Sequence, residues 1–217
     1  MKGQNRMTTT FQGFHNQDFE VLDLPGLDAR MEGIRSVIQP KFQQLGELLS
    51  GELSAMAGDE MFVHIAKHAR RTVNPPADTW MAFCGNKRGY KQHPHFQIGL
   101  WNDRVFAWFA LIYELPDKRR MAEALLEQAD TVRSLVPEHY SLSFDHMKKE
   151  DIKAGTLSSE DWTKALERFR DVKSCELLIG RVWPADSAEL ANGEQLAAQI
   201  RATFQTLMPL YQITRSI

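Results

Sequence analysis

The sequence predicts an α+β domain: a largely antiparallel sheet of about six to seven strands, covered by helices. Four strand-like runs lie close together at 61–66, 79–84, 94–100 and 104–113, with hairpin-type connections between them. Long apolar stripes at helical spacing occur on both sides of these runs. Since the apolar faces of a sheet must be buried against other elements, we expect these helices to cover it.

The N-terminal part is expected to hold one strand and one long helix. Residues 18–24 (DFEVLDL) are predicted to form a strand that Pro25 and Gly26 end. An apolar stripe with steps of three and four then runs through residues 27–56, which predicts a helix with one buried face. Pro40 lies inside this stripe, so we expect a kink or two helices in line there.

The third and fourth strands differ in their pattern. Residues 94–100 alternate apolar and polar side chains, which predicts one buried face and one polar face that carries His95 and Gln97. Residues 104–113 are apolar on both faces, as in a covered central strand. Residues 85–93 are expected to form a long basic hairpin loop.

The C-terminal half is predicted to alternate helices and strands. The expected elements are a helix at 117–136, a strand at 139–145, a polar loop at 146–157, a helix capped by Ser158 or Ser159, a strand at 175–183 and a helix from about 192. In the strand at 139–145, Ser141 and Ser143 are expected on the outer, polar side. No linker interrupts this order, so residues 11–217 are predicted to form one domain behind a disordered lead at residues 1–10.

Composition favours a cytoplasmic protein. The chain has 43% hydrophobic and 25% charged residues, which is ordinary for a globular domain. No apolar run approaches the roughly 18 residues of a membrane span, and the first residues lack the apolar core of a secretory signal. The two cysteines, Cys84 and Cys175, do not make a disulfide framework and are expected to stay reduced. Met7 is an alternative start.

A positive island is the main candidate for a functional site. Residues 61–100 hold six basic residues and one acid, a net charge of +5 in a chain whose net charge is −2. Such an island suits a negatively charged ligand, although a solvated charged surface is the alternative. The candidate ligand-binding residues are Lys67, Arg70, Arg71, Lys87, Arg88, Lys91, His93, His95 and Trp101.

Two basic loops are expected to form this site together. The segments 67–71 and 87–95 lie on either side of the strand at 79–84, and strands 61–66 and 79–84 are expected to be neighbours. We therefore predict that both loops meet at one end of the sheet, near His95. Arginine forks suit phosphate or carboxylate, so the expected ligand is a phosphorylated small molecule or a nucleotide.

Other chemistries fit the residues less well. His93 and His95 have an H-x-H spacing that metal sites use, but we favour hydrogen-bonded histidines and assign no metal. Cys84 borders the basic loop, where cations would lower its pKa, but a small buried apolar residue is the more common role. Phosphate-binding glycine motifs and the nucleophile-elbow motif are missing. A pI near 6.4 makes nucleic acid a less favoured partner.

Two stretches make the chain recognisable: GDEMFVHIAKHARRTVNPP at 58–76 and NKRGYKQHPHFQIGLW at 86–101. They resemble the YktB family of uncharacterised bacterial proteins, and the resemblance extends from about Phe11 to the C-terminal helix. It implies a compact α+β domain and supplies neither catalytic residues nor a cofactor. A grouping of this topology with the biotin-ligase-like catalytic fold leaves an adenylate-forming or acyl-transfer enzyme open as an alternative. A nucleic-acid or protein-interaction module is a further alternative.

Overall fold

A seven-stranded antiparallel sheet organises the single α+β domain, as the sequence predicts. The computed structural model describes residues 10–217, and the strand order is β1-β2-β3-β4-β7-β5-β6. The strands are β1 (Phe62–Ile65), β2 (Asp78–Cys84), β3 (His95–Trp101), β4 (Arg104–Leu111), β5 (Ser141–Ser143), β6 (Ile152–Lys153) and β7 (Leu177–Pro184). The disordered lead predicted for residues 1–10 falls, apart from Thr10, outside the described residues.

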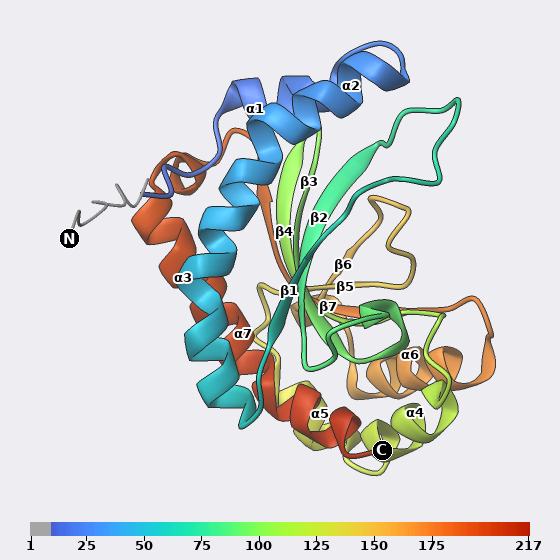
Figure 1. The fold of residues 1–217 in the computed structure, drawn as a ribbon. Coiled ribbons are helices and arrows are strands. Elements are labelled where there is room, and N and C mark those ends of the chain that lie inside the picture. Colours follow the sequence, from blue (N-terminus) through green and yellow to red (C-terminus); the bar gives the residue numbers. More distant parts are fainter. Residues whose placement is uncertain (1–9) are drawn as a thin grey trace.

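Two long helices cover one face of this sheet. Helices α3 (Gln39–Ala57) and α7 (Gly193–Arg215) lie together on that side, as Figure 1 shows. Their apolar stripes and the inward residues of the central strands are fully buried and form the main core. The other helical segments are α1 (Asn16–Glu20), η1 (Val21–Asp23), α2 (Leu27–Gly33), η2 (Ile34–Ile38), η3 (Tyr90–Gln92), α4 (Lys118–Leu126), α5 (Ala129–Leu135), η4 (Ala154–Thr156), α6 (Ser159–Asp171) and η5 (Ala188–Ala191).

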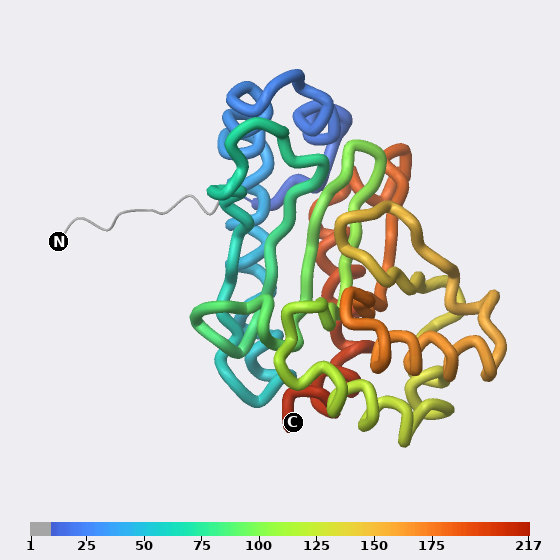
Figure 2. Tube along the Cα trace, turned by 90° about the vertical axis from the view of Figure 1, so that its right-hand side faces the viewer, coloured from blue at the N-terminus to red at the C-terminus, as the bar shows by residue number. Residues whose placement is uncertain are grey.

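The opposite face of the sheet, here called the open face, is bordered by loops. The loops at 66–77 and 85–94 flank it, and residues 144–151 cross over it; we call this last segment the strap (Figure 2). A second apolar cluster, separate from the main core, includes Trp101, Phe106 and Trp108 from β3 and β4. The open face therefore has an aromatic floor under the strap.

Strand register decides which side chains reach the open face. Gly99 of β3 stands opposite Phe106 of β4 and Trp80 of β2. A Cβ atom on Gly99 would lie 2.2 Å from the Phe106 ring, so only glycine lets this ring lie across β3. Two residue pairs further along, Asp78 stands opposite Trp101.

The predicted N-terminal strand at 18–24 is wrong, because these residues form α1 and η1. The Asp18 carboxylate is buried, accepts a hydrogen bond from the His15 N–H at 2.7 Å and pairs with Lys41. Phe19 and Leu22 are buried at helical spacing. A capping acid and helical burial therefore outweigh the strand propensity of this segment.

Three other boundaries differ from the expectation. The helix predicted at 117–136 is divided into α4 and α5, and both parts pack against α6. The polar loop predicted at 146–157 contains the short strand β6 and the turn η4. The irregularity expected near Pro40 is a π-helical turn, η2, that ends where α3 begins, with the proline in the first turn of α3.

Within residues 10–217, no helix combines the length and the apolar character that a membrane span requires.

Candidate functional site

The two basic loops leave β2 at opposite ends. β1 runs antiparallel to β2, with Phe62 opposite Cys84 and Ile65 opposite Met81. The loop at 66–77 therefore precedes the first residue of β2, while the loop at 85–94 follows its last residue. The prediction that both loops meet at one end of the sheet is wrong, because an antiparallel hairpin separates them by the length of the strand.

Most of the predicted cations point to solvent. Lys67, Arg70, Lys87 and Arg88 are exposed, and within residues 10–217 none of them forms an ion pair. The Lys87 ammonium lies 5.9 Å from the centre of the Phe62 ring. The structure does not bring these four side chains together.

Lys91, from the second loop, reaches the edge of the open face. The turn η3 folds back over the sheet, so that the Trp80 indole N–H donates to the Tyr90 hydroxyl at 2.7 Å. The Lys91 ammonium consequently lies 5.5 Å from the centre of the Trp80 ring and 3.5 Å from the Glu114 carboxylate. Arg71, from the other loop, is half-buried and donates to the Asn74 carbonyl.

These two cations act on the same small region. Burial, with the added charges of Arg71 and Lys91, lowers the pKa of His68 to about 4. The same two charges also lower the pKa of Asp78, against a larger opposing effect. Of the predicted cations, Arg71 and Lys91 are therefore the two whose charges act on both His68 and Asp78.

Asp78 is the most unusual ionisable group at this edge. It is only 2% exposed, and its Oδ1 atom has no hydrogen-bond partner within residues 10–217. Burial raises the pKa of Asp78 to about 6, although His146, Arg71 and Lys91 oppose this rise. A buried carboxyl group without a partner costs folding free energy, and such groups concentrate at functional sites.

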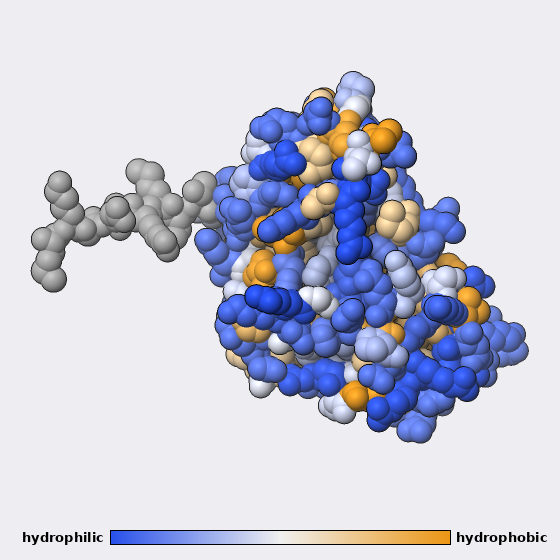
Figure 3. All heavy atoms as spheres, turned by 45° about the vertical axis from the view of Figure 1, so that its right-hand side comes forward, coloured by the Kyte–Doolittle hydropathy of each residue, from blue (hydrophilic) through white to orange (hydrophobic). Residues whose placement is uncertain are grey.

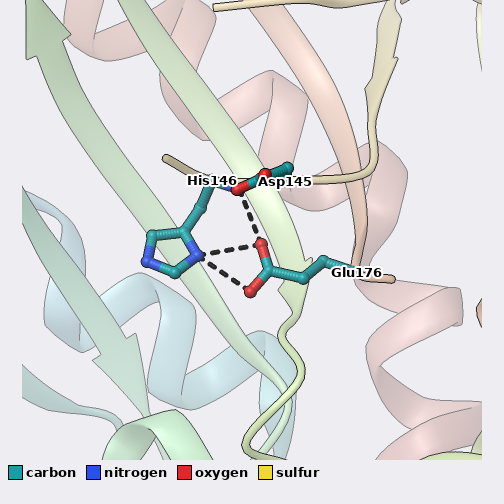
Figure 4. Close-up of side chains that lie close together, drawn as sticks. All are labelled: Asp145, His146 and Glu176. Atoms are coloured by element: carbon teal, nitrogen blue, oxygen red, sulfur yellow. Dashed lines mark hydrogen bonds and ion pairs between the residues drawn. The ribbon is translucent and has the colours of Figure 1, made fainter. Parts of the chain in front are cut away.

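His146, on the strap, is held by a buried carboxylate. Its backbone N–H donates to Glu176 Oε2 at 2.6 Å, and its Nδ1 lies 2.8 Å from both carboxylate oxygens. Because the carboxylate can only accept, Nδ1 carries the proton. Figure 4 shows the other ring nitrogen, Nε2, pointing away from Glu176. Nε2 forms no hydrogen bond within the described part of the chain.

Asp78 and His146 line one cavity between the strap and the sheet. Its floor is aromatic and its roof is the strap, and the space open to water is about 20 Å³. Roughly 10–15 Å³ of such space holds one water molecule, so the cavity has room for about one. A larger ligand must lie at the outer edge, beside Trp80, or displace the strap. The lining residues are Asp78, Trp80, Gln97, Trp101, Arg104, Phe106, Trp108, Ser143, His146, Lys148, Lys149, Glu150, Asp151, Leu178 and Val182.

The strap is fastened to the turn between β3 and β4. Arg104 Nη1 donates to the Lys149 carbonyl at 2.9 Å and to Asp151 Oδ1 at 3.2 Å. The Lys149 ammonium donates to Asn102 Oδ1 at 2.5 Å. The cations under the strap therefore have polar or acidic partners already, and positive charge remains available mainly at the outer edge.

His93 and His95 are hydrogen-bonded within the fold. His95 is fully buried, with Nδ1 2.7 Å from the His93 carbonyl and Nε2 2.8 Å from the Gln97 amide. Burial lowers the pKa of His95 to about 4, so the ring is neutral near pH 7. His93 Nε2 lies 2.9 Å from the Asn86 amide.

The side of the sheet that was predicted to be polar and outward is buried. His95 and Gln97 lie at 0% and 3% exposure, and Ser141 and Ser143 at 0% and 4%. Side chains of the open face are covered by the strap and by η3: Ser143 donates to the strap carbonyl of Glu150 at 2.9 Å, and the Tyr90 ring lies against His95. Alternation identifies the two faces of a strand, but not what covers the polar one.

Asp145, His146 and Glu176 also have ligand-type atoms within 4.8 Å of one another. Glu176 already accepts from the His146 backbone and ring, and from the Tyr113 N–H at 3.3 Å. Asp145 accepts from the Met147 N–H at 2.9 Å. His146 and Glu176 therefore form a hydrogen-bonded pair and the Asp145 carboxylate has its own partner, so no metal is assigned to them.

Sequence reasoning missed three central residues: Asp78, His146 and Glu176. Asp78 is the one acid in the basic island at residues 61–100. His146 and Glu176 lie 30 residues apart, with no local motif. The available signal was Glu176 itself, a charged residue directly before the apolar strand β7.

Comparison with known proteins gives the family. Residues 14–211 match the model of a domain of unknown function, DUF1054, and the chain belongs to this family. It is 54% identical over 202 residues to a UPF0637 protein of Shouchella clausii, which covers 93% of this chain and 94% of that protein. A UPF0637 protein of Oceanobacillus iheyensis is 52% identical over 201 residues, covering 93% and 96%. One from Listeria monocytogenes is 43% identical over 203 residues, covering 94% and 98%. The resemblance to an uncharacterised bacterial family is confirmed.

Proposed function

We propose that this protein binds a small anionic molecule, phosphorylated or of the nucleotide class, at the outer edge of the open face between Arg71 and Lys91. The observation that carries the proposal is the approach of these two cations, from loops at opposite ends of β2, to one group of polar side chains. Both act on the pKa of His68 and of Asp78. Within residues 10–217, Arg71 has no acidic partner, so its guanidinium is available to an anion.

The neighbouring rings suit a ligand with a planar part. Trp80 is half-buried at this edge, so part of its ring remains accessible. The His68 ring meets Trp80 edge to face, with 5.5 Å between the ring centres. Aromatic faces of this kind support stacking of a nucleobase or another flat group. Asp78 Oδ1 would accept a hydrogen bond from a donor on the same ligand.

A small ligand fits this side of the molecule better than a macromolecule. The surface seen obliquely from this side is mostly hydrophilic, and its hydrophobic residues are scattered (Figure 3). Large protein interfaces need a more continuous apolar centre. The exposed cations Lys67, Arg70, Lys87 and Arg88 belong to loops at the two ends of β2, whereas a nucleic-acid surface needs a continuous basic patch or stripe. The proposal places the protein in the cytoplasm, in keeping with two free, buried cysteines.

The experiment is a calorimetric and thermal-shift titration with inorganic phosphate, AMP and a sugar phosphate. We expect at least one of these to bind, and we expect R71Q and K91Q each to weaken its binding by about 1.5–3 kcal/mol, the value of a charged hydrogen bond. The matched control is R88Q, which neutralises an exposed arginine of the second loop. Binding that R88Q weakens as much as R71Q does would contradict the proposal, as would the failure of all three compounds to bind.

A further inference from the structure

We propose that Asp78 and His146 are the general acid and the general base of a phosphomonoesterase. The proposal rests on the proposed function for the position of the anion, and it adds a reaction that binding alone does not require. Three observations carry it: an imidazole with a free, directed nitrogen, a buried carboxyl group with an unpartnered oxygen, and a water-sized cavity that both residues line.

The base is His146 Nε2. Glu176 is 1% exposed and holds the imidazole through Nδ1, while a second bond from the His146 backbone fixes the same carboxylate. This arrangement keeps the proton on Nδ1 and leaves the Nε2 lone pair free to take a proton (Figure 4). A buried carboxylate performs this orienting role in many hydrolases, so Glu176 is the positioning residue.

The acid is Asp78. Its raised pKa, about 6, keeps a fraction of the carboxyl group protonated near neutral pH. The unpartnered Oδ1 is an atom from which a proton can be given to a ligand without breaking an existing hydrogen bond. The site holds two carboxyl groups in different environments: Asp78 is buried with an unpartnered Oδ1, and Glu176 is bound to His146. Differences in environment of this kind give two titratable groups in one site different roles.

Asp78 and His146 both lie close to Trp80. Asp78 is two residues before Trp80 on β2, and the His146 ring centre is 6.1 Å from that of Trp80. The charged and titratable groups that interact with Asp78 are Arg71 from one loop, Tyr90 and Lys91 from η3 and His146 from the strap. An anion held by Arg71 and Lys91 would lie beside Trp80, which also lines the cavity with room for about one water molecule.

The chemical step is an in-line hydrolysis. His146 Nε2 takes a proton from the cavity water as the water oxygen forms a bond to phosphorus. The bond between phosphorus and the leaving oxygen breaks, and that oxygen takes the proton of Asp78. One water is consumed, and the products are an alcohol or phenol and inorganic phosphate. Solvent returns a proton from His146 to Asp78 and resets the site.

The test compares two substrates that differ in their leaving group, phenyl phosphate and p-nitrophenyl phosphate, with the full chain. We expect the unaltered protein to hydrolyse both. H146Q should lower kcat by about 100-fold or more on both, since loss of a general base costs 10²–10⁴-fold. D78N should lower kcat by about 100-fold on phenyl phosphate and much less on p-nitrophenyl phosphate, because nitrophenolate leaves without a proton. E176Q should lower kcat with little change in KM, and it should change the pH profile of kcat.

Matched controls are H139Q and D186N, which alter an exposed histidine and an exposed aspartate outside the cavity. Both should keep full activity, and circular dichroism confirms that all variants are folded. If phosphate binds through Arg71 and Lys91 but neither ester is hydrolysed, the catalytic proposal is wrong while the proposed function stands. If D78N slows both esters equally, the acid role is wrong. If nothing binds and nothing is hydrolysed, both proposals fail.

Discussion

At the scale of single residues, the burial of the Asp78 carboxyl group costs folding free energy. Its Oδ1 has no partner within residues 10–217, and burial raises its pKa from 3.8 to about 6. The folded protein therefore holds this proton more tightly than the unfolded chain does. The resulting stabilisation is fully present below about pH 4 and is lost as the pH rises through about 6. Charged Asp78 consequently destabilises the protein at neutral pH.

This cost predicts that D78N is more stable than the unaltered protein at neutral pH. The substitution removes the charge and keeps nearly the same shape, so the free energy of unfolding at pH 7.5 should rise by about 1–3 kcal/mol. The gain should shrink toward zero near pH 4, where Asp78 is already protonated. Urea unfolding at both pH values provides the measurement. A gain of the same size at both would show that charge is not its origin.

At the scale of elements, the sequence predicts the central sheet well and its covering less well. β2, β3 and β4 begin and end within about two residues of the predicted runs, because alternation and short turns are local signals. The strand predicted at 18–24 fails because the role of Asp18 depends on Lys41, a distant partner. Ser158, rather than Ser159, caps α6, and its Oγ accepts from the Asp161 N–H at 3.1 Å.

The strap forms one wall of the cavity. Arg104 fastens it through the Lys149 carbonyl and Asp151. We expect R104Q to loosen the strap and expose Trp101 and Trp108, which are each 7% exposed in the closed arrangement. Acrylamide quenching of tryptophan fluorescence should therefore increase. The control is R119Q, which removes only a surface pair between Arg119 and Glu123. Equal quenching in R104Q and the control would mean that Arg104 does not hold the strap closed.

At the scale of the whole molecule, the site is an arrangement that no short motif encodes. Asp78 comes from β2, His146 from the strap and Glu176 from the residue before β7. In the sheet β3 and β4 lie between β2 and β7, and the strap brings the His146 ring to 6.1 Å from the Trp80 ring of β2, between ring centres. The basic island is visible in the sequence, but the antiparallel hairpin divides it and leaves Arg71 and Lys91 at the open face. Charge composition indicates a region, and topology decides which of its cations act on Asp78.

The central claim is that an anion binds at the outer edge of the open face, next to Trp80. The five tryptophan indole N–H groups report on this directly, because each gives its own signal in an NMR spectrum of the ¹⁵N-labelled protein. Trp80 lies at the proposed site and Trp101 lines the adjoining cavity, whereas Trp162 and Trp183 are buried in the main core. On titration with inorganic phosphate or AMP, we expect the Trp80 signal to shift in a saturable manner and the Trp101 signal to follow. The signals of Trp162 and Trp183 should stay in place. Saturable binding that leaves the Trp80 signal unmoved would contradict the account.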